Sequence, residues 1–95
     1  MSIDKTLAER EDRYGSFFSH AEISQELKEV MIGSGFWTKL NRSQSEALEM
    51  IQHKVARILN GDPNYVDNWH DIAGYATLVE NLLTEAEANG THNQG

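Results

Sequence analysis

The chain has no cysteine and only one proline among its 95 residues. Without cysteine it forms no disulfide and offers no thiolate ligand to a metal ion. Its stability must therefore come from packed side chains, with help from self-association. No apolar run is long enough to span a bilayer, and the N-terminal sequence MSIDKTLAERED holds no apolar leader segment. We therefore expect a cytoplasmic protein that does not bind membranes.

Basic residues are also few. Eight Lys and Arg stand against 15 Asp and Glu, which gives a formal net charge of −7. A chain of this charge lacks the basic surface with which proteins bind duplex nucleic acid, so direct binding to a duplex is disfavoured. An acidic surface favours solubility, and it also suits cationic partners or ligands bridged by a metal ion.

Helical periodicity predicts an all-α fold. A first helix is expected from about Asp4, a capping residue, to about Asp12, with Gly15 ending that segment. The sequence SHAE at 19–22 matches the capping-box pattern and predicts the start of a second helix. Phe17 and Phe18 precede this start and are expected to pack it against the core.

Glycines at positions 33 and 35 predict the end of the second helix, because glycine adopts a left-handed C-cap at little cost. The segment 36–40 is expected to be a helical turn or linker that carries Trp37 and Leu40 into the core. Trp69 is expected to be a core or interface residue for the same reason, since buried aromatic rings contribute much of the energy of a small core.

The clearest prediction is a C-terminal antiparallel helical hairpin of about 44–60 and 67–88. A second capping box, SQSE at 43–46, starts its first helix, and Asn60-Gly61 with Pro63 ends it. Asp67 is a good N-cap for the second helix. The apolar arc of that helix is wide and predicts more than one neighbour, hence a homo-oligomer. Residues 1–88 are expected to form one domain and residues 89–95 a flexible tail.

One side of the helix at 44–60 is polar and carries His53, Arg57 and Asn60. The simplest interpretation is a solvated face. The alternative is a pocket closed by another helix or subunit, in which Arg57 and His53 bind a phosphate. Tyr14 and Lys28 would add a stacking ring and a phosphate ligand if their segments meet there. No two histidines have metal-ligand spacing, so no zinc site is expected.

Two carboxylate pairs, Glu46 with Glu49 and Asp67 with Asp71, each lie on one helix face. Carboxylates together with phosphate and water are the ligands of Mg²⁺. In the predicted hairpin, however, the pairs lie about 10 Å apart along the helix axes. A single four-carboxylate Mg²⁺ site within one chain is therefore disfavoured, although a second protomer or a tilted crossing would bring the pairs together. Lys54 is an expected ion-pair partner for Asp67 or Asp71.

Three segments resemble a family of small bacteriophage and prophage proteins: EREDRYG at 9–15, RILNGDP at 57–63 and DNWHDIAGYATLVE at 67–80. The resemblance covers most of residues 7–83 and implies a phage or prophage protein in the host-cell cytoplasm, without implying an activity. More loosely, the chain resembles all-α nucleotide pyrophosphohydrolases of the MazG type and nucleotide-modification-associated domains of phages. In those enzymes, E-x-x-E and E-x-x-D motifs hold Mg²⁺. Glu46 and Glu49 match the first motif, but Asp67 and Asp71 have D-x-x-x-D spacing and depart from the second.

Three hypotheses follow from these observations. The first is an accessory protein that binds or sequesters a nucleotide or nucleotide-like ligand without catalysis, through the residues Tyr14, Lys28, His53, Arg57 and Asn60. The second is a Mg²⁺-dependent nucleotide pyrophosphohydrolase whose metal ligands are Glu46, Glu49, Asp67 and Asp71. The third is an acidic protein that blocks a host partner and binds no small molecule.

Overall fold

The computed structural model describes residues 3–94, and it describes side chains for residues 3–89. Within this range the chain forms four α-helices, one 3-10 helix and no strand. The elements in chain order are α1 (Ile3–Tyr14), α2 (Phe17–Ile32), η1 (Trp37–Lys39), α3 (Arg42–Asn60) and α4 (Val66–Gln94). The predicted all-α fold class is confirmed. None of the helices in this part of the chain combines the length and hydropathy that a membrane crossing requires.

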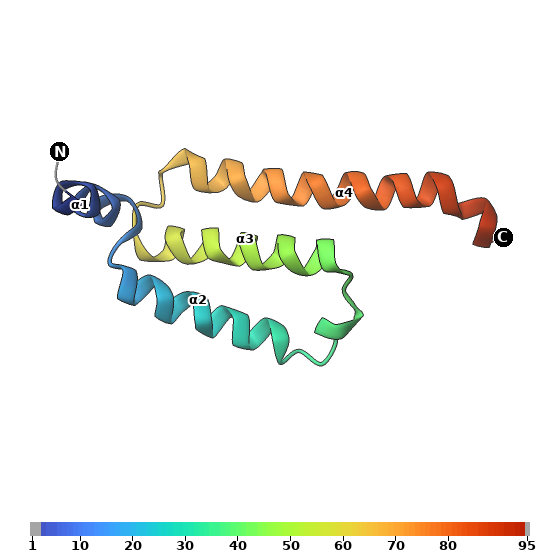
Figure 1. The fold of residues 1–95 in the computed structure, drawn as a ribbon, viewed down its shortest axis with the longest axis horizontal. Helices are drawn as coiled ribbons and strands as arrows, with labels where there is room; N and C mark the ends of the chain where they lie inside the picture. Colours follow the sequence, from blue (N-terminus) through green and yellow to red (C-terminus); the bar gives the residue numbers. More distant parts are fainter. Residues whose placement is uncertain (1–2, 95) are drawn as a thin grey trace.

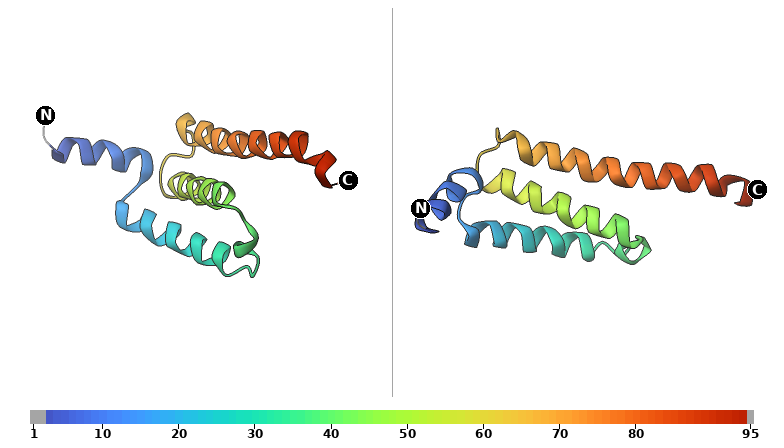
Figure 2. Two further views of the ribbon diagram at one scale, coloured as in Figure 1. Left: turned by 45° about the vertical axis from the view of Figure 1, so that its right-hand side comes forward. Right: turned by 45° about the horizontal axis from the view of Figure 1, so that its top comes forward.

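Helices α2, α3 and α4 lie side by side, with α3 in the middle (Figure 1). Each runs antiparallel to its neighbour, so the predicted hairpin of α3 and α4 is confirmed. Two further views show the same arrangement, with α1 placed at the end of the bundle where α2 begins and α3 ends (Figure 2). α4 continues well past the start of α3. The bundle is therefore elongated, with extents of 59 × 28 × 22 Å.

Two helix starts differ from the prediction. α2 begins at Phe17, where the N-cap Ser16 accepts a hydrogen bond from the backbone N–H of Ser19 at 3.2 Å. α3 begins at Arg42 behind a capping box formed by Asn41 and Gln44, with side-chain to backbone distances of 2.8 and 2.9 Å. Both capping boxes proposed from the sequence, at 19–22 and 43–46, are wrong, because those residues already have helical backbone. A cap requires the extended backbone that Ser16 and Asn41 adopt.

The helix ends agree better with the sequence. α3 ends at Asn60 as predicted. α4 begins at Val66, so Asp67 already lies within the helix and is not its N-cap, contrary to the prediction. α4 continues to Gln94, beyond the predicted end at 88. The predicted flexible tail, 89–95, falls almost entirely on residues whose side chains are outside the described range, and Gly95 is outside it altogether. Gly33 ends α2 with a φ of −77°, so the predicted left-handed cap is wrong at this position.

The interior is small and largely polar. Ala47 and Ala56 are the buried apolar side chains in the described range, whereas four polar ones are buried: His20, Ser24, Gln52 and Asn68. A single row of helices gives α2 and α4 one long neighbour each, so their outward faces stay open. The aromatic core predicted from the sequence does not form.

Phe17 and Phe18 are largely exposed and do not anchor α2, contrary to the prediction. Trp69 is also exposed, although its Nε1–H donates to the Pro63 carbonyl at 2.8 Å and so fixes the loop before α4. Trp37 and Leu40 are half-buried, and η1 is the helical turn that the sequence predicted for this segment.

The turn after α1 and the turn after α3 meet backbone to backbone. A Cβ added to Gly15 would collide with the Asn60 carbonyl, and one added to Gly61 would collide with the backbone of Arg13 and Tyr14. The Asp62 N–H donates to the Arg13 carbonyl at 2.8 Å. Only glycine permits so close an approach at both turns. We call this contact the glycine junction, and it fixes α1 against the end of α3.

Substituting Gly15, one of the two glycines of the junction, should destabilise the fold. Gly15→Ala places a Cβ at a backbone φ of +76° and against the Asn60 carbonyl, so we expect a loss of about 2–4 kcal/mol of unfolding free energy. Gly74→Ala is the control, because nothing lies within 4 Å of an added Cβ there and alanine favours a helix interior by about 0.5–1 kcal/mol. Urea denaturation measures both. Equal stability of the two variants would contradict the junction.

Candidate functional site

A cavity of about 310 Å³ lies where α1 meets the start of α2 and the last turns of α3. It brings together three of the ligand-binding residues predicted from the sequence, Tyr14, His53 and Arg57. The glycine junction forms part of its wall through Gly15. The complete lining is Leu7, Arg10, Glu11, Tyr14, Gly15, Phe17, His20, His53 and Arg57.

Two arginines flank the ring of Tyr14 in this cavity. The guanidinium carbon of Arg57 lies 4.2 Å from the ring centroid and that of Arg10 lies 5.3 Å away. Contacts of this kind hold a guanidinium in place while leaving its N–H groups free to donate. Glu11 also lines the cavity, yet within residues 3–89 no carboxylate lies at ion-pair distance from Arg10 or Arg57. Both positive charges therefore remain available to an anion.

Two histidines complete the polar wall. The rings of His20 and His53 meet edge to face, with centroids 4.6 Å apart. His20 is only 7% exposed, and its Nδ1 has no hydrogen-bond partner in the described structure. Buried polar atoms are nearly always paired in folded proteins. Two further unpaired side-chain nitrogens belong to Gln52 and Asn68, which do not line the cavity.

Both histidines are neutral at pH 7. Burial and, after it, the positive charge of Arg57 together with smaller contributions lower the pKa of His53 to about 4. Burial and Arg57 also lower the pKa of His20. A neutral imidazole offers one donor and one acceptor, whereas an imidazolium offers two donors. An anion placed between these rings and Arg57 would favour the protonated form of both.

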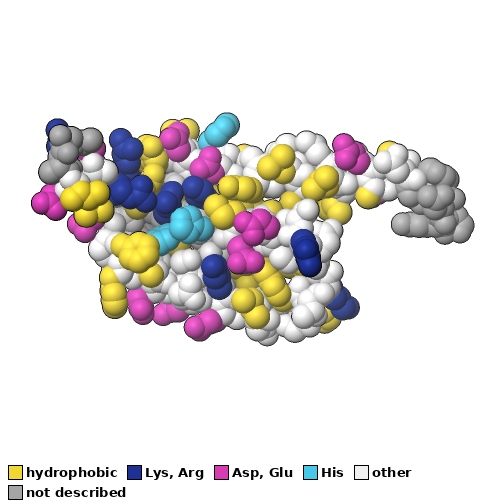
Figure 3. Space-filling model, viewed as in Figure 1, with side chains coloured by type: hydrophobic (Ala, Val, Ile, Leu, Met, Phe, Trp, Pro, Cys, Tyr) yellow, Lys and Arg dark blue, Asp and Glu magenta, His cyan; other side chains and the backbone are white. Residues whose placement is uncertain are grey.

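The surroundings of the cavity are positive although the whole chain is acidic. Lys28 and Lys54 lie close enough to lower the pKa of His53. The Arg13 guanidinium stands 5.1 Å from the ring of Tyr65, which in turn packs edge-on against Tyr14. Figure 3 shows a group of Lys and Arg side chains beside the histidines, near the end where α1 lies. Arg10, Arg13 and Arg57 thus gather at this end, where they attract anions. The two lysines are paired with carboxylates on α3 and α4.

Two of the predicted ligand-binding residues lie outside the cavity lining. Asn60 donates both amide hydrogens to backbone carbonyls, those of Tyr14 at 2.8 Å and Ser16 at 2.9 Å. Its amide group therefore holds the glycine junction together. Lys28 extends from α2 toward α3 and pairs with Glu49 at 3.8 Å. Both residues support the site from its edge.

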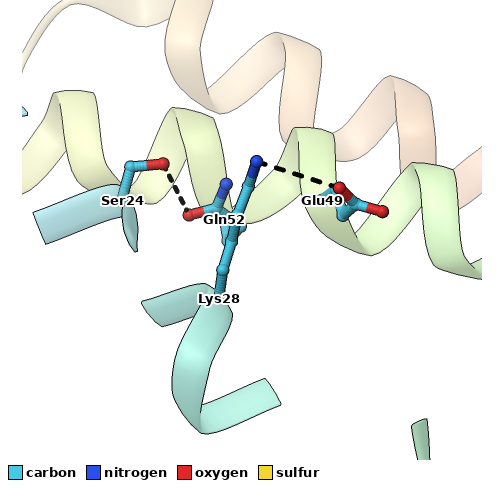
Figure 4. Close-up of polar contacts among 4 residues, drawn as sticks. All are labelled: Ser24, Lys28, Glu49 and Gln52. Atoms are coloured by element: carbon cyan, nitrogen blue, oxygen red, sulfur yellow. Dashed lines mark hydrogen bonds and ion pairs between the residues drawn. The ribbon is translucent and has the colours of Figure 1, made fainter. Parts of the chain in front are cut away.

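The contact between Lys28 and Glu49 belongs to a polar seam between α2 and α3 (Figure 4). Ser24, one turn before Lys28, donates its hydroxyl hydrogen to the Gln52 side-chain oxygen at 3.1 Å, and both of these residues are buried. The Gln52 amide nitrogen has no partner in the described structure. With His20 one turn before Ser24, the seam continues the polar wall of the cavity into the bundle.

The four carboxylates predicted to bind Mg²⁺ have separate surroundings. Asp71 pairs with Lys54 at 3.1 Å, as predicted for that lysine, and Asp67 accepts a hydrogen bond from the Tyr65 hydroxyl at 3.0 Å. Glu49 faces Lys28, and Glu46 lines a second groove between α3 and α4. No group of three or more His, Asp or Glu side chains in the described range could hold a metal ion. The Mg²⁺ site stays a prediction from the sequence.

Sequence reasoning missed Arg10, His20 and Phe17 as residues of the cavity. Arg10 lies four residues before Tyr14 and so shares its helix face, which is a usable signal. His20 and Ser24 have the same spacing on α2 and could have indicated a polar stripe facing α3. Phe17 carried no such signal, because its position at the cavity depends on where α1 turns.

The His53 pKa makes stability depend on pH. Between the folded-state pKa of about 4 and the ordinary value of 6.5, the unfolded chain binds a proton that the folded chain does not. The contribution of neutral His53 to the unfolding free energy is therefore fully present above pH 6.5, and it is lost as the pH falls toward 4. We expect His53→Gln to flatten the pH dependence of the unfolding free energy across this window, measured by urea denaturation. His70→Gln, at an exposed position, should keep the parent slope; a parent slope in both variants would contradict the assignment.

Comparison with known proteins gives one match. Neither the curated proteins nor the solved structures contain a sequence or fold that matches this chain. A protein family described as a domain of unknown function, DUF6378, matches residues 3–83. This range includes the glycine junction, every residue that lines the cavity and most of the α3–α4 hairpin. The chain therefore belongs to the DUF6378 family.

Proposed function

We propose that the protein binds or sequesters a nucleotide or nucleotide-like ligand in the cavity between α1, α2 and α3. One observation carries the proposal: Arg10 and Arg57, which have no ion-pair partner in the described structure, flank the ring of Tyr14 in a cavity that His20 and His53 also line. An anion would accept hydrogen bonds from both guanidinium groups at once. The accessory role in a phage or prophage, and a place in the host-cell cytoplasm, depend on the sequence resemblance of residues 9–15, 57–63 and 67–80.

The phosphate of the ligand would lie beside the two arginines. A guanidinium donates two parallel N–H groups to phosphate oxygens, which makes arginine well suited to a phosphate. Arg57 and Arg10 approach from α3 and α1 respectively, so the phosphate would be held between two helices. His20 and His53 would add hydrogen bonds from α2 and α3.

The remainder of the ligand would contact the apolar part of the lining. Leu7 and Phe17 contribute side chains that are largely exposed in the free protein. An exposed aromatic ring beside a phosphate site provides a surface on which a nucleobase stacks, a contact worth about 1–3 kcal/mol. The volume of about 310 Å³ lies at the small end of ligand pockets, which range from about 300 to 1,000 Å³. It suits a mononucleotide better than a dinucleotide or a larger cofactor.

The positions of the carboxylates favour a protein that binds a nucleotide over one that hydrolyses it. Phosphate transfer with Mg²⁺ needs carboxylates near the phosphate, and the cavity lining contains one, Glu11. The predicted Mg²⁺ ligands Glu49, Asp67 and Asp71 instead face Lys28, Tyr65 and Lys54. Self-association is part of the proposal too, because many large apolar side chains remain exposed in the single chain.

Arginine 57 gives the sharpest test of the binding site. A panel of nucleoside monophosphates, triphosphates and cyclic mononucleotides is screened by thermal shift with and without Mg²⁺, and the best binder is measured by calorimetry. We expect Arg57→Met to weaken the affinity for this nucleotide about 10- to 100-fold, since a hydrogen bond to a charged group contributes about 1.5–3 kcal/mol. Arg42→Met removes the same charge from the other end of α3 and should leave the affinity within about two-fold.

Other results would overturn the binding proposal. Hydrolysis of a nucleoside triphosphate that requires Mg²⁺ and is lost in Glu49→Gln would identify the pyrophosphohydrolase. No thermal shift with any nucleotide, together with a host protein that binds the purified chain stoichiometrically, would identify the acidic blocking protein. If Arg57→Met and Arg42→Met weakened the nucleotide affinity equally, the nucleotide would be attracted by the overall charge of the chain and would have no specific site in the cavity.

Affinity should also rise as the pH falls. A bound phosphate raises the pKa of His53 and His20, so binding takes up protons and becomes tighter at lower pH. A cyclic mononucleotide is the suitable probe, because its phosphodiester keeps one negative charge throughout. We expect its affinity to increase several-fold between about pH 7 and about pH 5, measured by calorimetry in two buffers of different ionisation enthalpy. An affinity that is constant over this range, with no proton uptake, would exclude the histidines from the site.

A further inference from the structure

The surface of α4 carries a second feature, far from the cavity. A groove of about 520 Å³ runs between the first turns of α3 and the middle of α4. Its apolar lining comes from Ala47, Tyr75, Leu78, Val79 and Leu82. Figure 3 shows apolar side chains along the strip where α3 and α4 meet. We call this feature the α3–α4 groove.

Two exposed leucines in the wall of the groove form a ridge along α4. Leu78 is 60% exposed and Leu82 is 49% exposed, and they lie four residues apart on α4. Residues at this spacing stand one above the other on a helix. Such a pair is the typical anchor of a helix that docks in an apolar groove. One chain therefore presents both the ridge and the groove, on the same helix.

The solvent-accessible surface of the chain is large for its mass. The accessible surface is 7047 Å², whereas a compact monomer of this size exposes roughly 5,500 Å². The radius of gyration is 17.0 Å, against about 12 Å for a compact domain of this length. A stable interface of standard size buries about 800 Å² on each partner. The excess area is about twice that amount, so one chain has enough unburied surface for a complete interface of standard size.

We propose that the α3–α4 groove docks a second copy of this chain, forming a two-fold symmetric dimer in which the α4 helices pack antiparallel. A two-fold interface uses the same patch on both partners, and the Leu78–Leu82 ridge in the wall of its own groove is such a self-complementary patch. The rim contains Arg42 together with Glu46 and Glu85, so each copy offers charges of both signs to the other.

The dimer surface and the ligand cavity are separate. The groove contacts α3 at Ala47 and the cavity contacts it at Arg57, which is roughly 15 Å along the helix at 1.5 Å per residue. Docking of a second copy therefore leaves the cavity open. The dimer makes the self-association proposed above specific, and it does not depend on the proposed ligand, so ligand binding and dimer formation can each fail without the other.

Sedimentation equilibrium of the full chain tests the dimer. We expect the mass of two chains at micromolar concentration, with tighter association at high salt, because two copies of net charge −7 repel each other. Leu78→Glu combined with Leu82→Glu should give a single-chain mass with unchanged helical circular dichroism. Leu59→Glu is the matched control, since Leu59 is exposed on α3 and lies outside the groove, and it should remain dimeric.

Cysteine cross-linking keeps the test decisive if the double variant does not fold. The chain has no native cysteine, so Leu82→Cys creates one unique thiol. A bis-maleimide cross-linker should join two copies through it, whereas Leu59→Cys should give no more cross-linking than a collision control at the same concentration. A wild-type chain that stays monomeric at high salt, a dimer unaffected by both glutamates, or equal cross-linking of the two cysteine variants would each overturn the proposal. Occupation of the groove by a different protein, with a monomeric chain, would overturn it as well.

Discussion

The glycine junction is the contact on which the rest of the structure depends. It places the turn after α1 directly on the turn after α3, and the side-chain amide of Asn60 closes it with two hydrogen bonds. α1 has no buried residue of its own in the described structure, so its position follows from this backbone contact and not from an apolar face. The cavity exists because α1 is held there: without it Tyr14 and Arg10 would have no fixed position relative to Arg57.

The polar interior explains how this fold is related to its site. Buried polar groups cost stability unless they are paired, and a small bundle can tolerate few of them. Here His20, which lines the cavity, and Gln52 and Asn68, which do not, each keep one unpaired atom in the described structure. Burial and, after it, the positive charge of Arg57 lower the pKa of both neighbouring histidines, so protonating either one costs stability. A site that is unfavourable when empty becomes favourable when an anion enters, which is the usual relation between stability and function at a binding site.

The sequence predicted the elements of this fold better than their packing. The α3–α4 hairpin followed from strong local signals, the Asn60-Gly61 stop and the Pro63 loop. The starts of α2 and α3 did not, because Ser16 competes with Ser19 as a cap and Asn41 with Ser43, and only the backbone decides between them. The exposure of Phe17 was unpredictable for a different reason: it follows from the arrangement of the helices in one row, which periodicity does not specify. For the site, the polar face of α3 predicted His53 and Arg57, whereas the role of Asn60 depended on a contact between distant turns.

The polar seam between α2 and α3 has a consequence for motion. Hydrogen bonds and ion pairs such as those of Ser24 and Lys28 exchange protein partners for water with little net change in free energy. α2 carries Phe17 and His20 into the cavity wall, so one helix supplies both the polar seam and part of the wall. Any shift of α2 along the seam would therefore change the shape of the cavity.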